Sequence, residues 1–194
     1  LSSLYTMREE YDKAIEVLNT LPKVNVNTDF MLSTIYSITG DSKRAKTIEQ
    51  ESLFNNINNS IISLASLWGT ALKERDFEFA MELATIQRKL IIDFKLEGYL
   101  MGNNFLMFAD IYAVRNDVNR TLDYIEKYAN WALSTDTSAL DLSNNKFFNL
   151  VENLTPTMSF DYQKQTFINS VVKNSDYDFV KYSDRYKKII GRLI

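Results

Sequence analysis

The sequence predicts an all-α protein, and its composition, its apolar periodicity and a repeated segment all support this fold class. Only five Gly and two Pro occur in 194 residues, too few for the many turns of an all-β chain. Apolar residues recur at helical spacing along most of the chain. A short pattern also returns at roughly 30- to 40-residue intervals, which is typical of stacked helical repeats.

The repeated pattern combines an aromatic or small residue, an acidic residue and a second small residue at fixed spacing. Its four copies are Tyr5-Glu10-Ala14, Tyr36-Asp41-Ala45, Ala71-Asp76-Ala80 and Tyr112-Asp117-Thr121. We expect each copy to form two helices joined by a tight turn, with the acid capping the second helix at the positive end of its dipole. The small residue one turn later lets the two helices approach closely. Because such a hairpin cannot cover its own apolar faces, neighbouring hairpins must stack.

These copies resemble tetratricopeptide repeats. The resemblance is closest in LYTMREEYDKAIEVL and in LSTIYSITGDSKRAKTIEQ, where Gly40-Asp41 stands at the turn. Arg75 replaces the turn Gly in LASLWGTALKERDFEFAMELA, and Asn116 replaces it in FLMFADIYAVRNDVNRTLDYIEKY. The resemblance covers residues 1–133. It implies a right-handed superhelix of about four to five antiparallel helix pairs.

Residues 139–194 continue the helical pattern with a weaker repeat signal. Helical spacing in 142–154 and 159–172, on either side of Pro156, predicts a fifth, degenerate pair. The tail predicts a capping helix whose apolar stripe consists of Phe179, Tyr182, Tyr186, Ile189, Ile190 and Leu193. We therefore expect a single tetratricopeptide-like solenoid over residues 1–194.

The tail NSDYDFVKYSDRYKKIIGRL, following a helix pair, resembles the C-terminal ends of bacterial XRE-type transcriptional regulators. Those proteins join an N-terminal helix-turn-helix DNA-binding domain to a tetratricopeptide domain. Leu1 begins within an amphipathic pattern, so we expect a DNA-binding domain upstream, and DNA contact only through it. The resemblance implies a cytoplasmic regulatory domain that binds a peptide or protein segment in its concave groove. It is also compatible with a homodimer. A general scaffold with no switching role remains the alternative.

The composition excludes several other function classes. There is no Cys and no His, so thiolate nucleophiles, His-based triads and structural zinc sites are ruled out, and we expect no enzyme, metal or cofactor. The net charge of −3 gives no general attraction to nucleic acid. Residues 53–72 carry no charge, but the polar side chains at 55–60 argue against a membrane span.

The first helix of each tetratricopeptide pair faces the groove, which gives a set of expected ligand-binding residues. These are Phe30, Met31, Thr34, Ser66, Asn103, Met107 and Asp110, followed by Asn145 and Asn149 at i, i+4 spacing on the next helix. An Asn amide donates and accepts, so it matches a peptide backbone without reading side chains. The resemblance implies the same role, since groove Asn residues bind peptide in its peptide-sensing members. The competing interpretation is that these Asn side chains cap helix ends.

Overall fold

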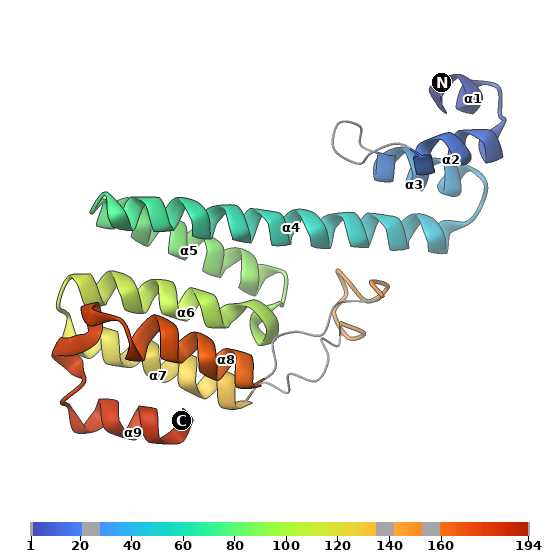
Figure 1. The fold of residues 1–194 in the computed structure, drawn as a ribbon. Helices are drawn as coiled ribbons and strands as arrows, with labels where there is room; N and C mark the ends of the chain where they lie inside the picture. The colour runs from blue at the N-terminus through green and yellow to red at the C-terminus, as the bar shows by residue number, and fades with distance from the viewer. Residues whose placement is uncertain (1, 21–27, 135–141, 153–159, 194) are drawn as a thin grey trace. The chain divides into compact units, whose positions relative to one another are not determined.

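The computed structural model of the chain describes residues 2–20, 28–134, 142–152 and 160–193. Its regular elements are helices, and no strand occurs in these ranges, which confirms the all-α fold class (Figure 1). Contacts divide the chain into two compact units. Unit 1 is Leu1–Asn58 with Asp141–Asn153, and unit 2 is Asn59–Leu140 with Leu154–Ile194. The single solenoid over 1–194 stays a prediction.

Unit 1 contains α1 (Ser2–Met7), α2 (Tyr11–Thr20), α3 (Thr28–Ile38) and the first part of α4 (Ser42–Lys73). Its small core consists of Ala14, Leu18, Leu32 and Ile35, each no more than 7% exposed. Burial of these four residues joins α2 to α3, because neither helix covers its apolar stripe alone.

Residues 142–152 also belong to unit 1 and form turns instead of the predicted helix. The Asn145 side chain accepts a hydrogen bond from the backbone N–H of Phe147 at 3.0 Å, a local bond that competes with helix formation. Phe148 packs edge-on to Phe54 of α4, with ring centroids 5.4 Å apart. The prediction of a helix in the first half of the degenerate pair is therefore wrong over these residues. Residues 139–141 and 153–159 of that pair lie outside the described ranges.

Helix α4 is continuous over 32 residues, where the repeat pattern predicts two separate helices. The second helix of copy two and the first helix of copy three are thus one element. No Gly or Pro occurs between Ser42 and Trp68, so the sequence contains no strong signal to end the helix. The Asn-rich stretch at 55–60 lowers helix propensity but supplies no break.

Unit 2 contains the last part of α4, then α5 (Phe77–Asp93), α6 (Glu97–Val114) and α7 (Val118–Ser134). These helices run back and forth as successive hairpins, with α6 in contact with both α5 and α7 (Figure 1). Because both faces of α6 are covered, most of its residues from Met101 to Ala113 are buried. Two apolar clusters result, one against α4 and α5 and the other against α7 and the C-terminal elements.

The C-terminal part of unit 2 contains α8 (Phe160–Phe167), the π-helix η1 (Ile168–Val172), the 3-10 helix η2 (Ser175–Val180) and α9 (Asp184–Leu193). Helix α9 packs on α7 through Tyr186, Ile189 and Leu193, so a helix does form where the tail predicts one. Tyr182 is 85% exposed, however, and its predicted place on the apolar stripe is wrong. It precedes α9, so helical spacing does not apply to it. None of the described helices is long and apolar enough to cross a membrane.

The four repeated turns share one backbone conformation, which explains the pattern that predicts them. Glu9, Gly40, Arg75 and Asn116 have φ values of 60°, 88°, 61° and 55°, and each immediately precedes the acidic residue. The left-handed residue closes the first helix, as in a Schellman motif. The side chains of Asp41, Asp76 and Asp117 each accept a hydrogen bond from the backbone N–H three residues later, at 3.0 to 3.1 Å. The small residues Ala14, Ala45, Ala80 and Thr121 are at most 3% exposed.

Candidate functional site

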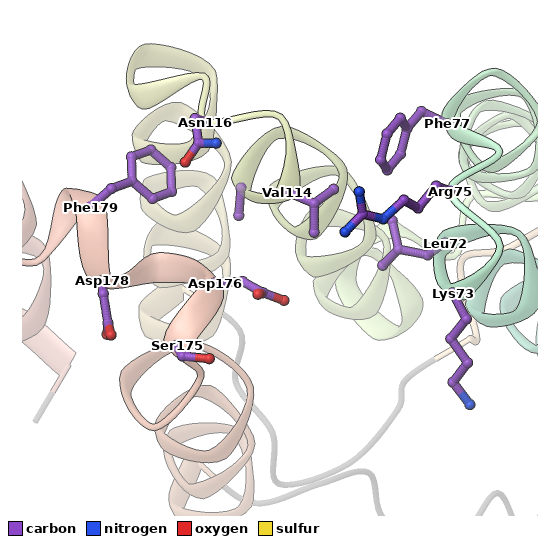
Figure 2. Close-up of a pocket in the computed structure, with 11 residues that line it drawn as sticks. Leu72, Lys73, Arg75, Phe77, Val114, Asn116, Ser175, Asp176, Asp178 and Phe179 are labelled. Carbon is purple, nitrogen blue, oxygen red and sulfur yellow. The ribbon is translucent and has the colours of Figure 1, made fainter.

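Two cavities in unit 2 are the candidate sites. The aromatic cavity, of about 170 Å³, lies among α6, α7 and α8. Its lining residues are Tyr99, Leu100, Asn103, Leu106, Tyr128, Trp131, Tyr162, Gln163 and Thr166. The turn-side cavity, of about 630 Å³, lies at the helix ends beside η2 (Figure 2). Its lining residues are Leu72, Lys73, Arg75, Phe77, Ala113, Val114, Asn116, Ser175, Asp176, Asp178 and Phe179.

The wall of the aromatic cavity is fixed by a close approach between α6 and α7. A Cβ atom at Gly102 would lie 2.2 Å from a ring carbon of Trp131, so only Gly admits the indole at this point. The indole Nε1 donates a hydrogen bond to the Glu97 carbonyl oxygen at 2.9 Å. The Tyr128 hydroxyl donates to the Gln163 carbonyl oxygen at 2.8 Å and so joins α7 to α8. The aromatic rings are therefore held in place before any ligand arrives.

Asn103 is the polar residue of α6 that reaches this cavity while remaining exposed. Its Nδ2 lies 3.8 Å from the Met107 sulfur, which is a weak acceptor, and this is the one side-chain hydrogen bond found for it among the described residues. The amide oxygen and one amide hydrogen are thus available to a ligand. Asn103 thus lines a cavity and is exposed, and its role in ligand binding stays a prediction.

The other predicted groove residues of α6 are engaged within the protein. Met107 is 1% exposed and lies in the apolar cluster shared with α4 and α5. Asp110 Oδ1 accepts a hydrogen bond from the Tyr177 hydroxyl of η2 at 2.6 Å. Both residues lie on the same helix face as Asn103, at i+4 and i+7. Neither side chain is free for a ligand, because Met107 is buried and Asp110 is already bonded to Tyr177.

The Asp110 carboxyl titrates unusually. Its pKa is raised from 3.8 to about 7, with burial as the largest cause and the charge of Asp176 acting in the same direction. The hydrogen bond from Tyr177 acts in the opposite direction and lowers the pKa. Burial likewise raises the pKa of the Tyr177 hydroxyl, and the Asp110 charge adds to that effect. The Tyr177 hydroxyl therefore stays protonated and remains the donor.

The remaining predicted residues are divided between the two units. In unit 1, Phe30 is 66% exposed on α3, Met31 packs against the core, and the Thr34 hydroxyl donates to the Phe30 carbonyl oxygen at 2.8 Å. Ser66 is exposed on the part of α4 that belongs to unit 2. Among these four, Phe30, Thr34 and Ser66 are exposed.

Asn145 and Asn149 do not share a helix face, because the segment that carries them forms turns. Asn145 is 6% exposed and bonds to the backbone of its own turn, the role of a local cap. Asn149 Oδ1 accepts a hydrogen bond from Gln50 Nε2 at 3.0 Å, and Gln50 Oε1 accepts one from the Leu150 N–H at 2.8 Å. Their expected i, i+4 arrangement on one helix face is therefore wrong.

Sequence reasoning missed a buried polar network one residue away from Asn103. Asn104 is fully buried, and its Nδ2 donates to the Ala84 carbonyl oxygen at 2.8 Å and to Gln87 Oε1 at 3.0 Å. Arg88 Nε donates to Asn104 Oδ1 at 3.0 Å, with its guanidinium carbon 4.3 Å from the centre of the Phe108 ring. The signal was the position of Asn104 among the apolar residues of α6, where a polar side chain needs internal partners.

The turn-side cavity has a basic wall and an acidic wall. Lys73 is the last residue of α4 and Arg75 lies in the turn that follows, while Asp176 and Asp178 come from η2. Figure 2 shows the guanidinium of Arg75 and the carboxylate of Asp176 directed into the space from opposite sides. The two walls thus present charges of opposite sign to the same cavity.

No protein-family model, curated protein or solved structure significantly matches this chain. Within the ranges that the structure describes, no group of three or more His, Cys, Asp and Glu side chains is placed to hold a metal ion. The candidate sites are therefore interpreted from their own chemistry.

Proposed function

We propose that this chain is a protein-interaction domain of tetratricopeptide-like architecture that binds a peptide or an extended protein segment along α6. The observation that carries this proposal is Asn103, an exposed amide at the edge of a preformed aromatic cavity. Its amide would bond to the backbone of the bound segment, and the cavity would take one side chain. The regulator resemblance supports a sensing role, in which the chain is the regulatory part of a bacterial transcriptional regulator.

The shared turn supports the architectural part of the proposal. Every copy of the repeat has a residue in the left-handed conformation, followed by an acidic residue and then by a buried small residue. The acidic side chain caps the second helix in three of the four copies. A further turn of the same kind joins α5 to α6, where Lys95 has φ 56° and the Leu96 N–H donates to the Ile91 carbonyl oxygen at 2.9 Å. Stacked hairpins with equal turns are what a helical repeat requires.

The size and lining of the aromatic cavity define the ligand that it fits. A volume of about 170 Å³ suits one large apolar or aromatic side chain and is too small for a drug-sized molecule. The rings of Tyr99, Tyr128 and Trp131 offer apolar contact. A segment held by its backbone at Asn103 and by one side chain here would be selected for an apolar residue at that position.

Selection from a displayed library of random peptides, followed by calorimetry, tests this function. We expect the selected peptides to share an apolar or aromatic residue. Asn103→Ala should weaken their binding by more than about 1 kcal/mol, the scale of a lost hydrogen bond, while the unfolding midpoint stays unchanged. Asn119→Ala is the matched control, since Asn119 is an exposed Asn of α7 that makes no side-chain hydrogen bond among the described residues. Equal affinity of both variants for every selected peptide would reject the site.

A sensor and a passive scaffold differ in their response to the bound peptide. A sensor must bind its ligand with different affinities in its two conformations, because otherwise the ligand shifts no equilibrium. X-ray scattering with a selected peptide should therefore show a change in radius of gyration or in oligomeric state. An unchanged profile at saturation would favour the scaffold.

A further inference from the structure

We infer that the turn-side cavity is a second binding site, which takes a small zwitterion with an apolar body, such as an unblocked apolar dipeptide. This site shares no lining residue with the aromatic cavity. The inference stands independently of the proposed function, since it depends on charges and contacts at the other end of α6.

Three of the four charged side chains on the two walls lack an ionic partner among the described residues. Asp178 pairs with Lys181 at 2.6 Å. Lys73, Arg75 and Asp176 form no ion pair with any other residue that the structure describes. A ligand with a carboxylate at one end and an ammonium group at the other would satisfy both walls at once. Its carboxylate would contact Arg75, where a bidentate pair is favourable, and its ammonium group would contact Asp176.

Both walls are held in place by contacts that do not involve the charged side chains. On the acidic side, the bond between Tyr177 and Asp110 fixes η2 to α6, and the Asp176 N–H donates to Asn174 Oδ1 at 3.0 Å. On the basic side, the Asp76 N–H donates to the Ala71 carbonyl oxygen at 2.9 Å and closes the turn that contains Arg75. The backbone of both walls is thus held in place before a ligand binds, which lowers the entropy lost on binding.

The apolar lining and the volume of the cavity indicate the polarity and the size of the ligand between its two charged ends. Leu72, Phe77, Val114 and Phe179 supply apolar surface between the charged walls (Figure 2). A volume of about 630 Å³ falls within the usual range of small-molecule sites and is large for a single amino acid. A dipeptide with two apolar side chains fills more of this space, and it carries both charges at its ends.

Calorimetry with the dipeptide leucyl-phenylalanine tests the charge requirement directly. We expect saturable binding to the full chain. The N-acetylated dipeptide and the dipeptide amide should each bind at least about tenfold more weakly, because each lacks one of the two charge-assisted contacts. Equal binding by the blocked dipeptides, or no binding of the unblocked one at millimolar concentration, would overturn the inference.

Two pairs of variants locate the site. Arg75→Asn and Asp176→Asn should each weaken binding at least about tenfold, and Asn at position 75 tolerates the left-handed backbone. Lys95→Asn and Asp161→Asn are the controls, since Lys95 has the equivalent turn conformation and neither residue lines the cavity. We expect both controls to bind as the original chain does. Loss of binding in Asn103→Ala, with Arg75→Asn unaffected, would place the dipeptide in the aromatic cavity and refute the inference.

Discussion

At the scale of single residues, backbone conformation at the repeated turn distinguishes the glycines of this chain. Gly40 has φ 88°, in the left-handed region that side chains disfavour, and a Cβ there would meet no atom within 4 Å. Gly191 lies inside α9, with the same open space and an ordinary helical backbone. The two positions thus isolate the backbone effect from packing.

We expect Gly40→Ala to lower the free energy of unfolding by about 1 kcal/mol, because it forces an L-residue into the left-handed conformation. Gly191→Ala should raise it by about 0.5–1 kcal/mol, because Gly in a helix interior costs more chain entropy than Ala. Urea unfolding of the full chain, followed by circular dichroism, measures both changes. Changes of the same sign in the two variants would contradict this interpretation.

Single residues of α6 explain why the candidate site could be predicted only in part from the sequence. The ligand-binding role of Asn103 stays a prediction, and the neighbouring amide of Asn104 is only one position away in α6. A rotation of about 100° places the first amide in solvent and the second in the core. Which amide faces which side depends on how α6 contacts α5 and α7, and local residue patterns do not encode that contact.

At the scale of elements, the close crossing of α6 and α7 depends on Gly102, which has no side chain to meet Trp131. Gly102→Ala would force the Trp131 ring to move, since the added carbon would overlap it. We expect a loss of about 1–3 kcal/mol in unfolding free energy, typical of overpacking, together with a change in tryptophan fluorescence. Gly98→Ala, one turn earlier in α6 with no atom within 4 Å, is the control. Equal unfolding midpoints for the two variants would disprove the close crossing.

Elements were predictable where the signal is local. The hairpin turns follow from short patterns of an acid and a small residue, and the structure places both as expected. The continuous helix α4 was not predicted, because the repeat pattern places a boundary there although no Gly or Pro occurs between Ser42 and Trp68 to end the helix. The turns at 142–152 were missed because their contacts with Gln50 and Phe54 join residues far apart in sequence.

At the scale of the whole molecule, Asp110 connects protonation to folding. Its carboxyl has a pKa of about 7 in the folded chain and an ordinary value of 3.8. Between these two pH values, the folded chain holds a proton that the unfolded chain has released. This contribution to stability is therefore complete below pH 4, declines as the pH rises through 7, and is absent above it. The chain has no His, so no imidazole titrates in the same pH range as Asp110.

We expect Asp110→Asn to remove this decline and to raise the unfolding free energy at pH 8 relative to the original chain, by on the order of a few kcal/mol. The Tyr177 hydroxyl can still donate to the Asn amide oxygen at this position. Asp184→Asn is the control, because the Asp184 side chain is 94% exposed. Thermal unfolding from pH 4 to pH 8 measures the difference between the two variants. Parallel curves for both would refute the raised pKa.

The π-helix η1 has a consequence for how this chain tolerates insertions and deletions. Its hydrogen bonds span five residues, as in the bond from the Lys173 N–H to the Ile168 carbonyl oxygen at 2.9 Å. A π-turn takes about one residue more than an α-turn for the same rotation of the chain. Loss of one residue here would therefore restore four-residue spacing with little change in the direction of the elements that follow, and Tyr177 could still reach Asp110. This segment is thus the place where the C-terminal part of unit 2 best tolerates a one-codon deletion.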